Sequence, residues 1–150
     1  MEKYRGGCSC GRVRFELADH PVWVIACHCN ECKKRTGSDY GISVMTASDN
    51  VSEFTGETKT FIRTGDSGSD VQYEFCPNCG TTVRWKVASL PGREALAGGA
   101  FDDISALRIA GELYADRTSP WVKLECDLHR PEAPDNPFRQ KLIDKAISLR

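Results

Sequence analysis

The sequence lacks any long apolar run. None of its segments approaches the roughly 20 apolar residues that a membrane-spanning helix requires, so we expect no helical membrane protein. It also lacks an excess of either charge, because 20 lysines and arginines stand against 21 aspartates and glutamates, for a formal net charge of -1. This balance argues against the basic surface of a general nucleic-acid binder, although local basic patches are compatible with it.

An apolar leader is absent as well. The first residues read MEKYR, and no apolar signal-peptide core follows them. We therefore expect a cytoplasmic protein. The length of 150 residues suits one domain, 1–150, that can bury a core without disulfides.

What the sequence does have is eight cysteines. A reducing cytoplasm keeps thiols from pairing, and cysteines there usually bind metals or carry out redox chemistry. A secreted disulfide scaffold would be shorter, denser in cysteine and preceded by a signal sequence. Metal sites are therefore the favoured interpretation.

Apolar residues recur along several short segments with the period of two that is typical of half-buried strands. The pattern starts at Val13, Phe15 and Leu17, which alternate with charged residues. Further strands are expected within 22–27, 41–45, 60–63, 71–75 and 83–87, and glycine- or proline-containing turns separate several of them. The sequence thus predicts a mainly antiparallel β domain.

Helix is predicted in few places. Asn30 is expected to cap a short turn that runs through Lys34 and is ended by Gly37. The clearest helix lies near the end of the chain, with Asn136 as its cap and Pro137 in its first position. Its apolar residues have helical spacings of four and three: Phe138, Leu142, Ala146 and Leu149. We expect this C-terminal helix to pack across the sheet.

The strongest metal motif is CPNCG at 76–80. A two-residue turn brings the thiolates of Cys76 and Cys79 onto one ion, and Gly80 permits a left-handed backbone. Tetrahedral zinc needs two more ligands. Cys8 and Cys10 are the best suppliers, because residues two apart in an extended segment project to the same side. Such a closed four-cysteine site would be structural.

Three further cysteines lie within six residues: Cys27, Cys29 and Cys32. They can present three thiolates to one ion. Three protein ligands with an open fourth position are typical of catalytic zinc. The division into four and three is not forced, because Cys27 and Cys29 could instead complete the site of the 76–80 motif.

Three residues could close the open site: His28, Cys126 and His129. If the segment around His28 is extended, its ring points away from the face of the cysteines, where it can still act as a hydrogen-bonding partner. Cys126 shares the face of an expected strand with Val122 and Leu124, and is most simply a small buried side chain. His129 is most simply a surface histidine.

These motifs resemble the glutathione-dependent formaldehyde-activating enzyme family, which shares its domain with centromere protein V. The resemblance rests on GGCSCG at 6–11, CHCNEC at 27–32 and CPNCGT at 76–81, with weaker matches in GAFDD at 99–103 and at Trp121. It implies a β-tent of folded antiparallel sheets and two zinc ions per chain. It assigns the structural zinc to Cys8, Cys10, Cys76 and Cys79. It assigns a second, substrate-facing zinc to Cys27, Cys29 and Cys32.

The resemblance also implies an activity. The reaction that names the family condenses glutathione with formaldehyde to S-hydroxymethylglutathione, so we expect a carbon-sulfur lyase that runs in the joining direction. Zinc with three thiolate ligands can deprotonate a substrate thiol without fully quenching its nucleophilicity, and the thiolate can then attack a small aldehyde. The expected partners are a glutathione-like thiol and a small aldehyde, with neither nucleic acid nor membrane.

Charged residues beside the second cluster are candidates for substrate contact. Lys33, Lys34 and Arg35 could receive a carboxylate of the thiol substrate, although a basic run on an exposed turn is more often a solvated surface. Glu31 could handle the hydroxyl proton of the adduct, and no other acid or base is evident.

Other functions fit the same motifs. In a zinc-stabilised interaction module, both ions would only hold the fold. A rubredoxin-like iron site uses a similar turn, but the one-residue spacing of Cys8 and Cys10 disfavours it. A methionine sulfoxide reductase also combines a β fold with cysteine-bound zinc, and here only Cys126 could serve as its redox cysteine. A zinc count tests for iron, and thiol binding separates an enzyme from a module.

Overall fold

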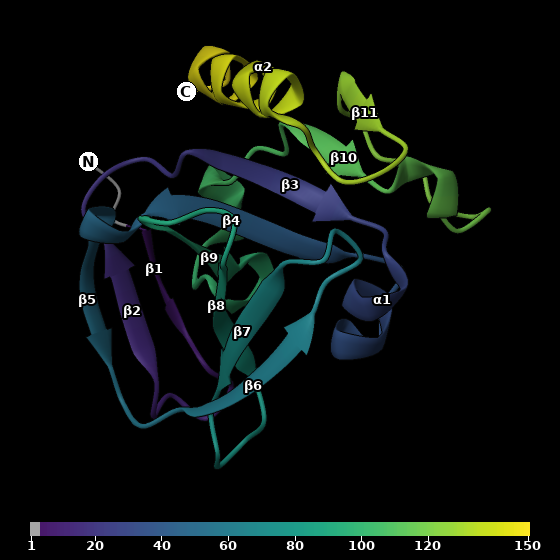
Figure 1. Ribbon diagram of the computed structural model, residues 1–150. Helices are drawn as coiled ribbons and strands as arrows, with labels where there is room; N and C mark the ends of the chain where they lie inside the picture. Colours follow the sequence, from purple (N-terminus) through teal and green to yellow (C-terminus); the bar gives the residue numbers. More distant parts are fainter. Residues whose placement is uncertain (1–3) are drawn as a thin grey trace. The chain divides into compact units, whose positions relative to one another are not determined.

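The structure, a computed structural model, describes residues 4–150. These residues form eleven β-strands, two α-helices and four 3-10 helices (Figure 1). Strands dominate, which confirms the predicted mainly β fold. The chain divides into two compact units, each built from two stretches of sequence: unit 1 from residues 4–22 with Val44–Ala106, and unit 2 from Trp23–Ser43 with Leu107–Arg150. The single domain over 1–150 stays a prediction.

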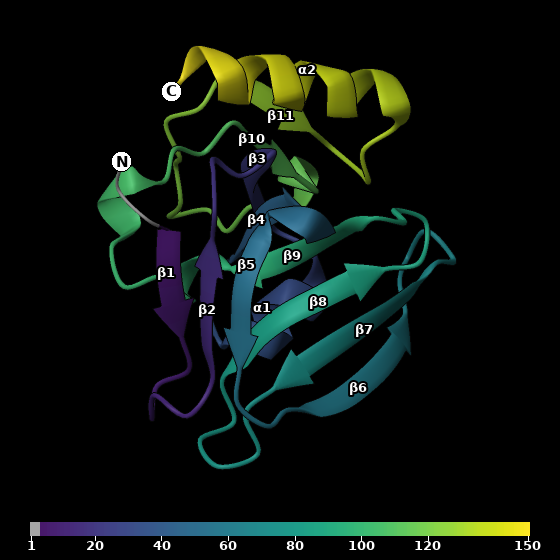
Figure 2. The same cartoon turned by 90° about the vertical axis from the view of Figure 1, so that its left-hand side faces the viewer.

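One sheet of unit 1 has three antiparallel strands. It contains β1 (Tyr4–Gly7), β2 (Arg14–Leu17) and β5 (Val51–Thr55), with β2 in the middle (Figure 2). Phe15 and Leu17 of β2 are buried, while their neighbours are partly exposed, so the alternation read from the sequence is the alternation of the strand. The turn between β1 and β2 carries Cys8 and Cys10.

The other strands of unit 1 form an antiparallel meander. It runs through β6 (Lys59–Thr64), β7 (Asp70–Phe75), β8 (Thr82–Val87) and β9 (Arg93–Ala97), and β9 neighbours β4 (Gly41–Ala47). Tyr73 and Trp85 face each other across β7 and β8, with ring centroids 5.8 Å apart. The loop from β7 to β8 carries Cys76 and Cys79.

The two sheets of unit 1 share a small apolar cluster beside these cysteines. It consists of Cys8, Val13, Cys76 and Val83, with Phe54 packed against it. All four central residues are buried. Apolar packing therefore already brings the β1–β2 turn next to the β7–β8 loop.

Three strands of the larger sheet lie in unit 2, and they pair in parallel. β10 (Gly111–Leu113) lies between β3 (Trp23–Cys27) and β11 (Leu128–Arg130) and pairs in parallel with both. The predicted mainly antiparallel arrangement holds for the strands of unit 1, whereas these three strands pair in parallel. The period of two reveals that a segment is a strand but not its direction, and the chain between β10 and β11 is long enough for a parallel crossover.

Two helices belong to unit 2, α1 (Asn30–Thr36) and α2 (Asn136–Ser148). Helix α2 packs on β3 and β11 through the buried side chains of Phe138 and Leu142. A β-carbon on Gly111 would lie 2.9 Å from Cδ2 of Leu142, so the glycine allows this close approach. No helix in residues 4–150 is long and apolar enough to cross a membrane.

Two local predictions are wrong. Residues 122–126 form no strand, because the segment pairs with no other strand in the described chain. The cap of α2 is Asp135 and not Asn136, since the Asp135 carboxylate accepts a hydrogen bond of 2.9 Å from Phe138 N–H and Pro137 takes the second position.

The 3-10 helices are η1 (Ser48–Asn50), η2 (Gly98–Ala100), η3 (Ile104–Ala106) and η4 (Ala115–Arg117).

Candidate metal centres

Four cysteine sulfurs meet in unit 1. The Sγ atoms of Cys8, Cys10, Cys76 and Cys79 all lie within 4.8 Å of one another. The sulfurs of Cys8 and Cys10 are 3.5 Å apart, and those of Cys10 and Cys76 are 3.7 Å apart. A disulfide needs about 2.05 Å, whereas two thiolates at about 2.3 Å from one tetrahedral zinc stand roughly 3.8 Å apart. The donors and their spacing therefore fit one zinc ion.

Two turns closed by glycines bring these sulfurs together. Gly11 N–H donates to the carbonyl of Cys8 over 3.0 Å, and Gly80 N–H donates to the carbonyl of Cys76 over 2.8 Å. Both glycines are left-handed, with φ of 81° and 78°. The expected extended segment at Cys8 and Cys10 is wrong, because residues 9 and 10 form a turn. The turn, and not a shared strand face, brings their sulfurs together.

Hydrogen bonds around the four-cysteine group stabilise thiolates. Val13 N–H donates to the Cys8 sulfur over 3.2 Å. A hydrogen bond of 3.3 Å between the Thr81 hydroxyl and the Cys79 sulfur lowers the pKa of Cys79 to about 5. Ser9 N–H donates to Oγ1 of Thr81 over 3.1 Å, which ties the two turns together. The group is thus complete and internally supported within unit 1.

The other three cysteines of the predicted sites meet in unit 2. The sulfurs of Cys27, Cys29 and Cys32 lie within 4.8 Å of one another. Cys27 ends β3 and Cys32 lies in the first turn of α1. The cap of α1 is Cys29 and not the predicted Asn30, because the Cys29 sulfur accepts a hydrogen bond of 3.3 Å from Cys32 N–H. Gly37 ends this helix with φ of 67°, as predicted.

This three-cysteine group is crowded and partly buried. Contacts with the thiols of Cys29 and Cys32, and then burial, raise the pKa of Cys27. Three thiolates this close repel one another, and a divalent cation between them removes the repulsion. The donor set fits a zinc ion with three protein ligands.

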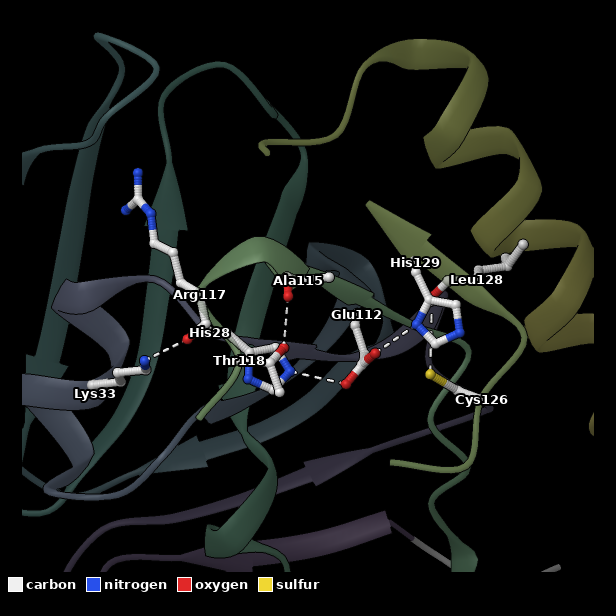
Figure 3. A network of polar contacts seen from close by, with 9 residues as sticks. All are labelled: His28, Lys33, Glu112, Ala115, Arg117, Thr118, Cys126, Leu128 and His129. Carbon is white, nitrogen blue, oxygen red and sulfur yellow. Dashed lines mark hydrogen bonds and ion pairs between the residues drawn. The ribbon is translucent and has the colours of Figure 1, made fainter. Parts of the chain in front are cut away.

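No fourth protein ligand completes the group within unit 2. In residues 23–43 and 107–150, no other cysteine, histidine, aspartate or glutamate belongs to it. The His28 ring is buried and its Nε2 lies 2.9 Å from Oε1 of Glu112 (Figure 3). Cys126 and His129 form a separate group with Glu112. The three residues that could have closed the site are thus engaged around Glu112.

The neighbouring charged residues of α1 have different surroundings. Lys33 Nζ donates to the backbone carbonyl of Arg117 over 2.5 Å, so this lysine holds η4 in place. Lys34 is exposed, and Glu31 is partly exposed in the first turn of the helix. The basic run therefore does not act as one unit.

Arg35 is the basic residue that lies beside the sulfurs. Its guanidinium and the Cys32 sulfur both pack against Gly41, where a β-carbon would lie 2.8 Å from Nη2 of Arg35 and 3.6 Å from Sγ of Cys32. The absence of a side chain at Gly41 leaves room for the guanidinium there. A positive charge next to the three-cysteine group suits an anionic ligand.

Cys126 is not poised as a nucleophile. Burial, followed by the negative charges of Glu112 and Asp127, raises the pKa of Cys126 to about 11. Because the thiolate is the nucleophilic form, this thiol is mostly unreactive at neutral pH, which disfavours the methionine sulfoxide reductase alternative.

The sequence analysis did not identify Glu112 as a site residue. Glu112 is the only charged residue in the segment 109–113, and a glutamate among uncharged residues is rarely buried unless it has a polar partner. That isolation is the signal that could have revealed it.

Comparison with known proteins now decides the family. A sequence profile described as glutathione-dependent formaldehyde-activating enzyme matches residues 3–117, which contain both cysteine groups. The chain belongs to the glutathione-dependent formaldehyde-activating enzyme family. The predicted family resemblance is confirmed. A Rhodobacter sphaeroides protein of known crystal structure aligns at 19% identity and a TM-score of 0.49, over 65% of this chain and 87% of that one.

The family match ends before the C-terminal part of the chain. Cys126, His129 and helix α2 all follow residue 117. The two cysteine groups are therefore features of the family-matched part, whereas the group around Glu112 combines that part with residues beyond it.

Proposed function

We propose that this member of the glutathione-dependent formaldehyde-activating family joins a glutathione-like thiol to a small aldehyde. With formaldehyde, the thiol RSH and CH₂O give RS–CH₂OH: a carbon-sulfur bond forms, the carbonyl π bond breaks, and the thiol proton ends on the new hydroxyl. The reverse reaction is that of a carbon-sulfur lyase. The observation that carries the proposal is the three-cysteine group that has no fourth ligand within unit 2.

The two cysteine groups would have separate tasks. Cys8, Cys10, Cys76 and Cys79 would hold a structural zinc that ties the two sheets of unit 1 together. Cys27, Cys29 and Cys32 would hold the second zinc, which when bound supplies a cation that lowers the pKa of a coordinating thiol. The chain itself places these ligands at a strand end and a helix start, with their sulfurs within 4.8 Å of one another.

Arg35 would orient the substrate. Glutathione carries two carboxylates, and a planar guanidinium can bind one of them with two parallel hydrogen bonds. Arg35 stands beside Cys32, whereas Lys33 is engaged with the Arg117 carbonyl. Lys34 is exposed and remains the candidate for a second, weaker carboxylate contact.

Glu31 is the proposed group for the proton of the adduct. It lies between Cys29 and Cys32 in sequence, in the first turn of α1. A carboxylate there could pass the thiol proton to the developing alkoxide. Replacing Glu31 with Gln should lower kcat and leave thiol binding intact.

Thiol binding to cobalt-substituted protein tests the proposal directly. Adding glutathione should change the thiolate-to-cobalt absorption bands, and Cys29→Ser should abolish the change. Formation of S-hydroxymethylglutathione from ¹³C-formaldehyde, followed by NMR, tests the reaction. Unchanged bands at millimolar glutathione would instead support the zinc-stabilised interaction module. Metal analysis of the protein as isolated, before cobalt substitution, would expose iron.

A further inference from the structure

A third group of ligating side chains lies in unit 2, apart from both cysteine groups. Glu112, Cys126 and His129 place one ligand atom each within 4.8 Å of one another. Glu112 and His129 are direct partners in the parallel pairing of β10 with β11, so their side chains lie on the same face of the sheet. Cys126 precedes β11 by two residues and reaches the same place.

The carboxylate at the centre of this group is buried and held from two sides. The Glu112 side chain is only 7% exposed, and its oxygens lie 2.9 Å from Nε2 of His28 and 2.6 Å from Nδ1 of His129. Figure 3 shows the carboxylate between the two imidazoles, with the Cys126 sulfur beside His129. The short contact to His129 requires a proton between the two atoms, because two lone pairs would repel each other. A neutral imidazole with its proton on Nδ1 can supply that proton, so a hydrogen bond already joins His129 to Glu112.

A metal ion can take the place of that bridging proton. Carboxylate, thiolate and imidazole are together the three donor types that zinc accepts, and the sulfur and nitrogen donors disfavour magnesium and calcium. A nitrogen and an oxygen on one tetrahedral zinc stand roughly 3.3 Å apart, so the hydrogen bond opens when the ion enters. The His129 side chain is 50% exposed and has room to move. The Cys126 thiol proton and the bridging proton go to solvent.

The fourth coordination position of such a zinc ion is accessible from a cavity. Glu112, Cys126 and His129 all line one cavity of about 480 Å³, whose other walls include Thr118, Val122 and Leu124. His28 donates to the remaining oxygen of Glu112, which is the kind of outer contact that orients ligating carboxylates.

We propose that Glu112, Cys126 and His129 form a third metal site, which binds zinc with three protein ligands and one position open to the cavity. The site lies outside the motifs of the formaldehyde-activating family, since two of its ligands follow the family-matched residues. The ion would attach the segment 126–130 to β10. Without the ion, the strand pairing between β10 and β11 covers only three residue pairs.

A zinc count on matched variants tests the third site. Reduced, metal-free full-length protein is reloaded with five equivalents of zinc, excess ion is removed, and zinc per chain is measured by mass spectrometry. Wild type should retain one ion more than Cys126→Ser and one more than His129→Gln. The control His20→Gln, which changes a histidine of unit 1, should match wild type. This difference of one ion does not depend on whether the other two sites are filled.

Cobalt provides a second readout that is specific for the sulfur. The difference spectrum between wild type and Cys126→Ser should contain a thiolate-to-cobalt band, while magnesium should produce no effect. Far-UV circular dichroism establishes that the variants are folded, which their partly exposed positions favour. Equal zinc counts in wild type and both folded variants would overturn the proposal and leave Glu112 and His129 as an ordinary hydrogen-bonded pair.

Discussion

At the scale of single residues, the placement of Arg35 depends on a missing side chain. Gly41 lets the guanidinium lie beside Cys32. The Gly41→Ala variant should fold, because the nearest atom to the added methyl group belongs to the flexible end of the Arg35 side chain. It should displace the guanidinium and raise the KM for glutathione about tenfold, the equivalent of about 1.4 kcal/mol, with kcat nearly unchanged.

Steady-state kinetics of S-hydroxymethylglutathione formation measure this effect. Lys34→Ala is the matched control and should change KM little, since its side chain is exposed. A larger effect of Lys34→Ala than of Gly41→Ala would contradict the orienting role of Arg35.

The left-handed glycine of the 76–80 motif makes a separate contribution. Gly80 has φ of 78° and open space where a β-carbon would lie. Gly80→Ala should therefore cost about 1–2 kcal/mol of unfolding free energy through backbone strain alone. Gly99→Ala, also in open space but without a positive φ, should cost much less. Urea unfolding of both variants in excess zinc measures the difference, and equal costs would argue against strain as the cause.

At the scale of elements, α2 depends on a cap that lies one residue earlier than expected. The Asp135 carboxylate accepts from Phe138 N–H, and it also pairs with Arg130 at 3.2 Å. Asp135→Ala should lower the unfolding free energy by about 1 kcal/mol. Asn136→Ala, which removes the cap that the sequence favoured, should have a smaller effect. Urea denaturation compares the two, and the reverse order would restore Asn136 as the cap.

Some elements were evident from the sequence and others were not. The alternation in β2, β7 and β8 predicted these strands, because each buries one face in the core. Five strands were missed: β1, β5, β9, β10 and β11. β1 and β10 are very short and contain glycine, and β10 buries a glutamate. The segment 122–126 shows why alternation alone is insufficient: its side chains alternate in burial, yet no neighbouring strand supplies hydrogen bonds.

At the scale of the whole molecule, each cysteine group lies entirely within one unit. The four-cysteine group connects two sheets of unit 1, whereas the three-cysteine group connects a strand end to the helix that directly follows it. Removing an ion should therefore have unequal consequences. Cys79→Ser should lower the unfolding free energy by roughly 3 kcal/mol or more, and Cys29→Ser should change it far less.

Urea unfolding with excess zinc, and again with a chelator, measures both variants. The chelator should destabilise wild type and Cys29→Ser strongly and Cys79→Ser little, because that variant has already lost its structural ion. Similar losses in both variants under excess zinc would show that the two groups do not differ in structural role.

Features whose parts are close along the chain, or repeat regularly, could be predicted from the amino-acid sequence. The spacings within 8–11, 27–32 and 76–80 bring sulfurs together through short turns, and the period of two follows from strand geometry, so neither needs knowledge of distant contacts. Contacts between residues that are far apart along the chain depend on how the chain folds. The parallel register of β10 with β3 and β11 places Glu112 between His28 and His129, and packing at Gly41 places Arg35 beside Cys32. Strand direction and register arise from the packing of whole units, which local spacing does not encode.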